Sequence, residues 1–155
     1  MNKELRISTQ INELDSSVIT FRGCAMSWQC DQMGHWSSRF IYNAFDDATV
    51  VLFALLGSPF SKAHATALGW VDVAQALEFL HEVHDGEAIT VSSHLVALGR
   101  TSVTFVHEMR TQVAAKPVAR MESKTVRFDM TRRCAIELED SFRRSARSFQ
   151  PGVRE

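Results

Sequence analysis

The sequence has few cysteines, and their arrangement excludes several specialised classes of protein. The 155 residues include only three, Cys24, Cys30 and Cys134. Their number is odd and none are closely paired as metal ligands usually are, so we expect free thiols in a reducing compartment. This argues against a disulfide-stabilised scaffold and against a cysteine-based metal centre.

The sequence also lacks a surplus of charge and a long apolar run. Its formal net charge of -1 argues against a nucleic-acid partner, because such binding usually needs a strong basic surplus. The longest apolar run, Val50–Leu56, is too short to span a bilayer. Residues 1–6 carry no apolar signal core. We therefore expect a cytoplasmic protein with no membrane partner.

The length and composition are those of an ordinary globular chain. Hydrophobic residues make up 45% and charged residues 23% of the sequence, close to the average for soluble domains. A chain of this size can bury one full core, so residues 1–155 are predicted to form a single domain. We expect its core over about 17–130 and a tail over 137–155.

One long amphipathic helix is the clearest predicted element, over Ser37–Leu56. Ser37 or Ser38 is suited to cap its first turn, and Gly57 with Pro59 ends it. Apolar residues recur at spacings of three and four and form one broad stripe: Phe40, Ile41, Ala44, Phe45, Ala48, Val51, Leu52, Leu55 and Leu56.

The remainder of the chain is rich in predicted strands. A first strand is expected within Ser17–Trp28, before the helix, and residues 58–65 are expected to form a loop. The apolar period then changes to two, which predicts strands over about 77–83, 89–95, 103–109 and 118–130. Turn signals at Asp85-Gly86, Gly99-Arg100 and Lys116-Pro117 would join them as an antiparallel meander. The order of elements predicts an α+β fold with the helix packed on one face of the sheet, followed by a short helix over 137–147.

The run Cys30-Asp31-Gln32-Met33-Gly34-His35-Trp36, directly before the long helix, is the most specific motif. Together with the helical stretch Phe45-Asp46-Asp47-Ala48 and the strands that follow, it resembles hotdog-fold acyl-CoA thioesterases of the 4-hydroxybenzoyl-CoA thioesterase type. The similarity extends over about Val18–Met130. It implies the hotdog fold, an antiparallel sheet of about five strands wrapped around one long helix. It also implies a homodimer or a dimer of dimers (a homotetramer) that hydrolyses an acyl-CoA without a cofactor.

Asp31 is the main candidate for the chemistry. Unpaired N–H groups at a helix N-terminus suit the oxyanion of thioester hydrolysis, and Asp31 places a carboxylate just upstream of them. It would attack the carbonyl directly or take a proton from water. The alternative is that Asp31 only caps the turn, a common role for aspartate. The resemblance favours catalysis, because the matching position in one branch of the family is the catalytic aspartate.

Three further positions of this turn are candidate site residues. Gly34 allows a sharp turn and close approach of a ligand. His35 would polarise a carbonyl or orient the substrate, or else bond to the local backbone. The resemblance assigns the backbone N–H of Ser38 to the oxyanion site. Relatives often carry asparagine after the Gly-His pair, where this chain has Ser37-Ser38, so their side-chain contacts to the acyl group are not carried over.

Asp46 is the competing carboxylate. In another branch of the family, a glutamate at the corresponding helical position is catalytic. On a regular helix Asp46 points away from the centre of the apolar stripe, and the alternative is a solvated helix acid. A second subunit packed against that face would favour the catalytic interpretation.

His81-Glu82-Val83-His84 is not expected to bind a metal, because on a strand the two histidines would face opposite ways.

Rival functions are a hotdog hydratase or dehydratase, which needs a paired Asp and His that the sequence does not show, and a non-enzymatic module that binds acyl thioesters. Neither the acyl group nor the carrier, coenzyme A or an acyl-carrier protein, follows from the sequence.

Overall fold

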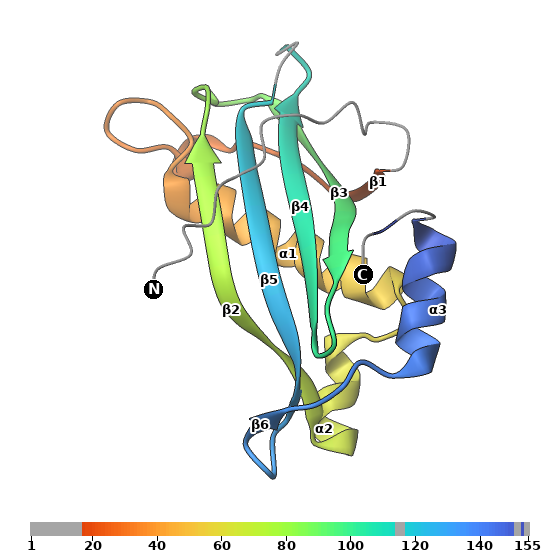
Figure 1. Ribbon diagram of the computed structural model, residues 1–155. Helices are drawn as coiled ribbons and strands as arrows, with labels where there is room; N and C mark the ends of the chain where they lie inside the picture. The colour runs from red at the N-terminus through yellow and green to blue at the C-terminus, as the bar shows by residue number, and fades with distance from the viewer. Residues whose placement is uncertain (1–16, 114–116, 151–152, 154–155) are drawn as a thin grey trace, which may run out of the picture.

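The computed structural model of the chain describes residues 17–113, 117–150 and 153, and has the predicted hotdog architecture. One long helix, α1 (Ser38–Leu55), lies against an antiparallel sheet (Figure 1). The strands are β1 (Val18–Cys24), β2 (Leu68–Phe79), β3 (Ala88–Leu98), β4 (Ser102–Thr111), β5 (Ala119–Asp129) and the short β6 (Cys134–Ala135). The other helical segments are η2 (Ser27–Gln29), η3 (Phe60–Lys62), α2 (Ala63–Thr66) and α3 (Asp140–Phe149).

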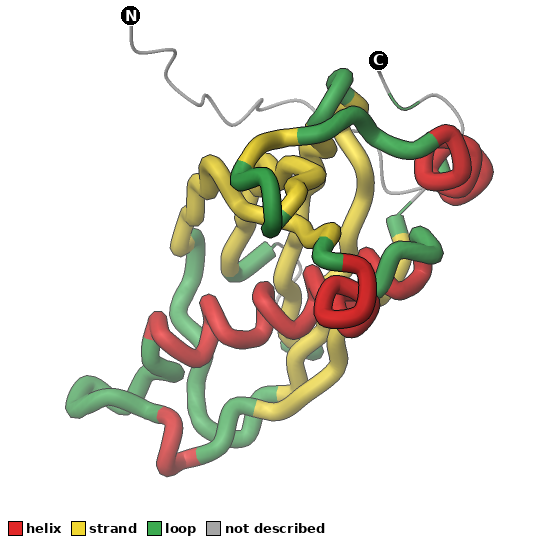
Figure 2. Tube along the Cα trace, turned by 90° about the horizontal axis from the view of Figure 1, so that it is seen from below, coloured by secondary structure: helices red, strands yellow, loops and turns green. Residues whose placement is uncertain are grey.

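The sheet has the strand order β1-β3-β4-β5-β2, with β6 added beside β5. Every pairing is antiparallel. Register shifts interrupt β1, β2 and β3, and such bulges bend a strand and increase its twist. Figure 2 shows α1 running along one side of the strands, so the helix occupies one face of the sheet.

The apolar stripe of α1 determines how the helix lies. Its inward side is buried at Ile41, Ala44, Phe45, Ala48, Thr49, Leu52 and Phe53. Burying one large apolar side chain contributes about 1.5–3 kcal/mol, more than a typical N-cap hydrogen bond of about 1 kcal/mol. The helix ends at Leu55, and Gly57, the residue predicted to stop it, follows the C-cap Leu56 with a φ of 76°. Ser58 N–H donates to Phe53 O at 2.9 Å, and Gly57 N–H donates to Ala54 O at 3.0 Å, which is a Schellman ending.

The core has two parts along α1. The N-terminal half of the helix packs with residues of β3, β4 and β5 and with Trp36. The C-terminal half packs with Trp70, Phe105 and the inner face of α3, chiefly Phe142. A half-buried ion pair fastens α3 to the sheet, because Arg127 of β5 donates to Glu139 at 2.7 Å. None of the described helices is both long enough and apolar enough to cross a lipid bilayer.

The four-strand meander predicted from the turn signals is wrong in one place. β3, β4 and β5 do form a meander, but β2 pairs with β5 at the far edge and not with β3. β2 is also earlier than predicted, since it begins at Leu68 and ends at Phe79. Residues 80–87 are therefore a crossing connection. The turn at Asp85-Gly86 exists, with a φ of 83° at Gly86, but it lies within this connection.

Smaller boundaries also differ from prediction. The first strand ends at Cys24 and is followed by η2. The expected loop over 58–65 contains η3 and the start of α2, and the tail helix runs over Asp140–Phe149.

A buried polar chain links the helix to the sheet. Thr49 of α1 donates to Phe45 O at 3.0 Å, and its Oγ1 lies 2.9 Å from His107 Nε2. Nε2 therefore carries the imidazole proton, and Nδ1 accepts from Ser93 Oγ at 2.5 Å. Ser93 in turn accepts from Thr20 of β1 at 2.6 Å. Burial, and then the neighbouring His94, lower the pKa of His107 from 6.5 to about 3.

This buried imidazole predicts a loss of stability in acid. The unfolded chain binds a proton at this histidine below about pH 6.5, whereas the folded chain does so only near pH 3. The free energy of unfolding should therefore keep its full value above pH 6.5. Below pH 6.5 it should decrease, by up to about 1.4 kcal/mol per pH unit. Urea unfolding measured at a series of pH values checks this.

Two variants separate His107 from the other histidines. His107→Gln should flatten the slope of the unfolding free energy against pH between about pH 6.5 and pH 5. His81→Gln, at an exposed histidine, should not. Equal slopes in all three proteins would contradict the assignment.

Candidate active site

The motif before α1 forms a tight, hydrogen-bonded turn. Cys30 and Trp36 form a bridge across its base. Within it, Asp31 N–H donates to His35 O at 2.8 Å, and Gly34 N–H donates to Asp31 O at 3.0 Å. Gly34 has a φ of 79°, and a Cβ built there would meet no atom within 4 Å. The glycine is therefore required for its backbone conformation, which other residues rarely adopt.

The side chain of Asp31 is held by its own turn. Oδ1 accepts from Met33 N–H at 2.8 Å and from His35 N–H at 3.2 Å. Thus the turn-capping role weighed from the sequence is real. The other oxygen, Oδ2, accepts no hydrogen bond from any residue that the structure describes. One carboxylate oxygen thus orients the group and the other is available to a ligand, so capping and chemistry are compatible.

A surface cavity of about 340 Å³ brings three of the five predicted residues together. Asp31, His35 and Ser38 line it, while Gly34 shapes the turn behind them. The other lining residues come from the start of α1 and from the end of β2 with the connection that follows it: Trp36, Ser37, Ile41, Phe79, Leu80, His81, Glu82 and Val83.

The first turn of α1 presents unused donors to this cavity. Ser37 is the N-cap residue, but its side chain makes no capping hydrogen bond, and no acidic residue lies in the first turn. Phe40 N–H donates to Ser37 O at 2.9 Å. Within the described part of the chain, no acceptor meets the N–H of Ser38 or Arg39. Free N–H groups and the positive end of the helix dipole make this a place for an anion.

The cavity has one apolar wall. Trp36 and Val83 are buried, and the Trp36 indole is fixed by a hydrogen bond to Gln29 at 2.9 Å. Phe79 and Leu80 remain 56% and 44% exposed. A polar side with a carboxylate and free N–H groups therefore faces an apolar side, which suits a ligand with a reactive polar group and an apolar tail.

The imidazole of His35 faces two residues that the sequence did not associate with the site. Its Nε2 lies 3.3 Å from Glu82 Oε2, and its ring centroid lies 5.2 Å from that of His84. The prediction that 81–84 belongs to a strand is wrong, because β2 ends at Phe79. Glu82 and His84 are two positions apart, a spacing that puts both side chains on one side of an extended segment. Their proximity to His35 depends on a long-range bridge between His35 and His84, which the sequence does not reveal.

Asp46 is not part of this cavity. It lies about 12 Å further along the helix axis than Ser38, at 1.5 Å per residue, and it is exposed. Partial burial, followed by repulsion from Asp72 and Asp47, raises the pKa of its carboxyl. Asp31 and Asp46 are thus in separate places on this chain.

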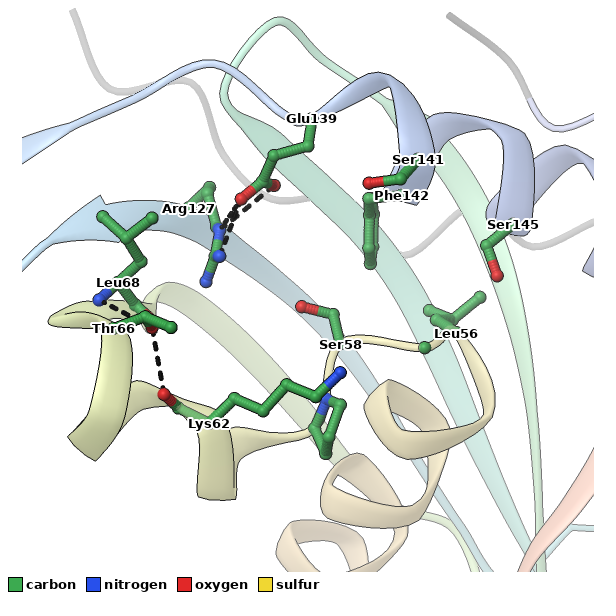
Figure 3. Close-up of a pocket in the computed structure, with 12 residues that line it drawn as sticks. Leu56, Ser58, Lys62, Thr66, Leu68, Arg127, Glu139, Ser141, Phe142 and Ser145 are labelled. Atoms are coloured by element: carbon green, nitrogen blue, oxygen red, sulfur yellow. Dashed lines mark hydrogen bonds and ion pairs between the residues drawn. The ribbon is translucent and has the colours of Figure 1, made fainter.

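A second cavity of about 340 Å³ lies at the other end of α1, between that end and α3 (Figure 3). Its main charged groups already have partners, since Arg127 donates to Glu139 and to Gly69 O. Ser58 accepts from the Trp70 indole at 3.0 Å. None of the predicted site residues lines this cavity, so the cavity at Asp31 is the better candidate for the active site.

Solved structures with the same fold include proteins of several bacteria. A hypothetical protein of Staphylococcus aureus, in complex with CoA, superposes with a TM-score of 0.80 at 11% identity, covering 90% of this chain and 88% of that one. A thioesterase of Thermus thermophilus, complexed with coenzyme A and Zn, gives 0.75 at 17% identity, with 88% and 97% covered. A 1,4-dihydroxy-2-naphthoyl-CoA thioesterase of Synechocystis gives 0.73 at 12% identity, with 83% and 94% covered.

Comparison at the level of sequence gives a family but no individual relative. No curated protein matches the chain. A family model described as the thioesterase-like superfamily matches residues 24–146, which includes the turn at Asp31, α1 and all the strands from β2 to β6. Because this match covers well over half of the chain, the protein belongs to the thioesterase-like superfamily.

Proposed function

We propose that the protein hydrolyses an acyl-CoA, or a related acyl thioester, to a free acid and a thiol. The observation that carries this proposal is the shared cavity of Asp31 and Ser38. A carboxylate with a free oxygen and a helix N-terminus with free N–H groups border the same space. Thioester hydrolysis needs both an attacking or proton-accepting group and a site for the oxyanion.

The helix N-terminus would hold the carbonyl oxygen. With the carbonyl directed at the N–H of Ser38, the negative charge that develops during attack meets a donor and the positive end of the helix dipole. Because these N–H groups have no other acceptor within the described residues, no protein hydrogen bond has to break before they bind the oxyanion.

Asp31 would supply the other half of the reaction. As a general base, its Oδ2 takes a proton from water, the water oxygen bonds to the carbonyl carbon, and the carbon–sulfur bond then breaks to release the thiolate. As a nucleophile, the same oxygen bonds to the carbonyl carbon and the carbon–sulfur bond breaks, which releases the thiolate and leaves an acyl-enzyme anhydride. Water then hydrolyses this anhydride to the free acid and regenerates the Asp31 carboxylate. Both routes use the carboxylate orientation that Met33 and His35 N–H groups impose on Oδ1.

The comparisons support the general reaction and the substrate class. The family is thioesterase-like, and two of the similar structures contain coenzyme A. The apolar wall formed by Trp36, Phe79 and Leu80 is suited to the acyl group. His35, paired with Glu82, is positioned to orient the substrate.

Replacing the carboxylate of Asp31 tests the proposal. Asp31→Asn keeps an oxygen that can accept from Met33 and His35 N–H, so the turn and ligand binding should persist. Turnover should fall by at least about a hundredfold, the scale of a lost general base. The assay is thiol release from aromatic, short-chain and long-chain acyl-CoAs, with ligand binding measured in parallel.

Asp46→Asn is the comparison variant, because Asp46 lies outside the cavity. Its turnover should stay within a few-fold of wild type. If Asp46→Asn is inactive while Asp31→Asn is active, the chemistry belongs to the helix. A wild-type protein that binds acyl thioesters without cleaving any of them would instead be a binding module.

We also propose that the protein is a homodimer, or a dimer of dimers, with a second copy against the cavity rim. Large apolar side chains are exposed on the segments that form the cavity and on the segment just before them. Phe79, which lines the cavity, is 56% exposed, Met33 of the Asp31 turn is 73% exposed, and Trp28 of η2 is 69% exposed. Exposed apolar clusters of this kind commonly mark an interface. The resemblance to hotdog thioesterases adds to this, because those proteins build each site from two subunits.

The dimer is checked by sedimentation equilibrium at micromolar concentration, where the mass should be at least twice that of the chain. Met33→Glu should weaken association, because it would place a charge within the apolar contact. Met130→Glu is the matched control, at a methionine that is 45% exposed beside the opposite end of the β2–β5 pair. A fully active monomer would contradict the proposal.

A further inference from the structure

Three side chains beside the cavity have the donor atoms of a transition-metal site. One ligand atom each from His35, Glu82 and His84 lies within 4.8 Å of the others. Two imidazoles and one carboxylate make up a donor set that is common for Zn²⁺ in proteins, in which a fourth position is left open. We propose that these three residues bind one transition-metal ion, with Zn²⁺ as the ion that fits the donor set best.

The backbone fixes the relative positions of the three residues. His35 and His84 form an antiparallel bridge, and Trp36 N–H donates to Val83 O at 2.7 Å. Val83 is buried while Glu82 and His84 on either side of it are exposed. Glu82 and His84 thus share the outward side of their segment and stand next to His35. The arrangement therefore follows from the hydrogen-bonded backbone of two segments.

The donor atoms are close to the spacing that a metal requires. With bonds of 2.0–2.2 Å, two ligand atoms of a tetrahedral zinc lie about 3.3 Å apart. His35 Nε2 and Glu82 Oε2 are already 3.3 Å apart. From the 4.8 Å limit, the imidazole of His84 has to approach by about 1.5 Å at most to reach the spacing of about 3.3 Å. Its exposed side chain can do so by rotating about χ1 and χ2.

These ligand atoms make few other interactions in the folded chain. Among the described residues, the side chains of Glu82 and His84 contact no hydrogen-bonding partner or counter-ion except His35. The bond from His84 N–H to Glu87 uses only its backbone. A metal would therefore not have to displace competing interactions, apart from the contact between His35 and Glu82. That contact is an ion pair only when His35 is protonated, and a pair with one solvent-exposed member contributes little.

The site would join the two walls of the cavity. His35 belongs to the turn that holds Asp31, and Glu82 belongs to the connection after β2, and both line the cavity. A bound ion would fasten the one wall to the other. The donor set also implies selectivity, because Mg²⁺ and Ca²⁺ prefer oxygen ligands.

Zinc titration of the full chain, freed of metal, tests the site directly. Wild type should bind one Zn²⁺ at these residues. Glu82→Gln and His84→Ala should each weaken binding at least about tenfold, since losing even an outer partner of a zinc ligand costs 10–100-fold. His81→Ala is the matched control, as His81 is an exposed neighbour outside the donor set, and should change affinity less than about twofold.

Thermal unfolding gives a second reading that does not depend on hydrolysis. Zn²⁺ should raise the midpoint of wild type and His81→Ala but not of Glu82→Gln or His84→Ala, because a ligand stabilises only the state that binds it. Mg²⁺ should raise none of them. No saturable zinc binding by wild type, equal affinity in all four proteins, or an equal loss in His81→Ala would overturn the proposal. Since neither measurement involves a thioester, its failure leaves the proposed hydrolysis untouched.

Discussion

The burial of one face of α1 against the sheet is the constraint on which the rest of the structure depends. The helix has to place Phe45, Ala48 and Leu52 against the strands, since each is fully buried. This fixes its axis and its rotation, and so determines where its N-terminus lies. The turn at Asp31 is joined directly to that N-terminus, and the cavity therefore sits at this end of the molecule. The position of the candidate site is a consequence of core packing.

The N-terminus of α1 is capped incompletely. A serine at the N-cap usually bonds to the first turn, yet the Ser37 side chain makes no such bond. The first N–H groups then stay free, at a cost of about 1 kcal/mol in helix stability. The burial of the apolar stripe is large enough to offset this. The N–H groups of the first turn can thus stay available to a ligand, because α1 is stabilised by the burial of its apolar face and not by capping hydrogen bonds.

The elements that depend on local sequence could be predicted, and those that depend on pairing could not. The apolar period placed α1 to within one residue at each end, and Gly57 marked its termination correctly. The hotdog fold followed from the motif and the order of elements. The strand order did not, because Asp85-Gly86 has the residues of a hairpin turn whether or not the flanking strands pair. Likewise the motif was enough to name Asp31 and Ser38 as candidates, and the structure places both on one cavity. Glu82 and His84 instead come next to His35 through contacts between segments nearly fifty positions apart.

The pairing of β2 with β5 has a consequence for how the molecule forms. β2 precedes β3, β4 and β5 in the chain, but its partner spans Ala119–Asp129. β2 therefore cannot pair until β5 has been made, and closing a loop of this length carries an entropic cost. Phe79 and the connection after it supply one wall of the cavity. On the ribosome, that wall is settled only after β5 has emerged, and pulse-labelled hydrogen exchange would detect protection of β2 after that of β3 and β4. During synthesis, the segment that forms the Asp31 turn is therefore present well before the second wall of the cavity can be in place.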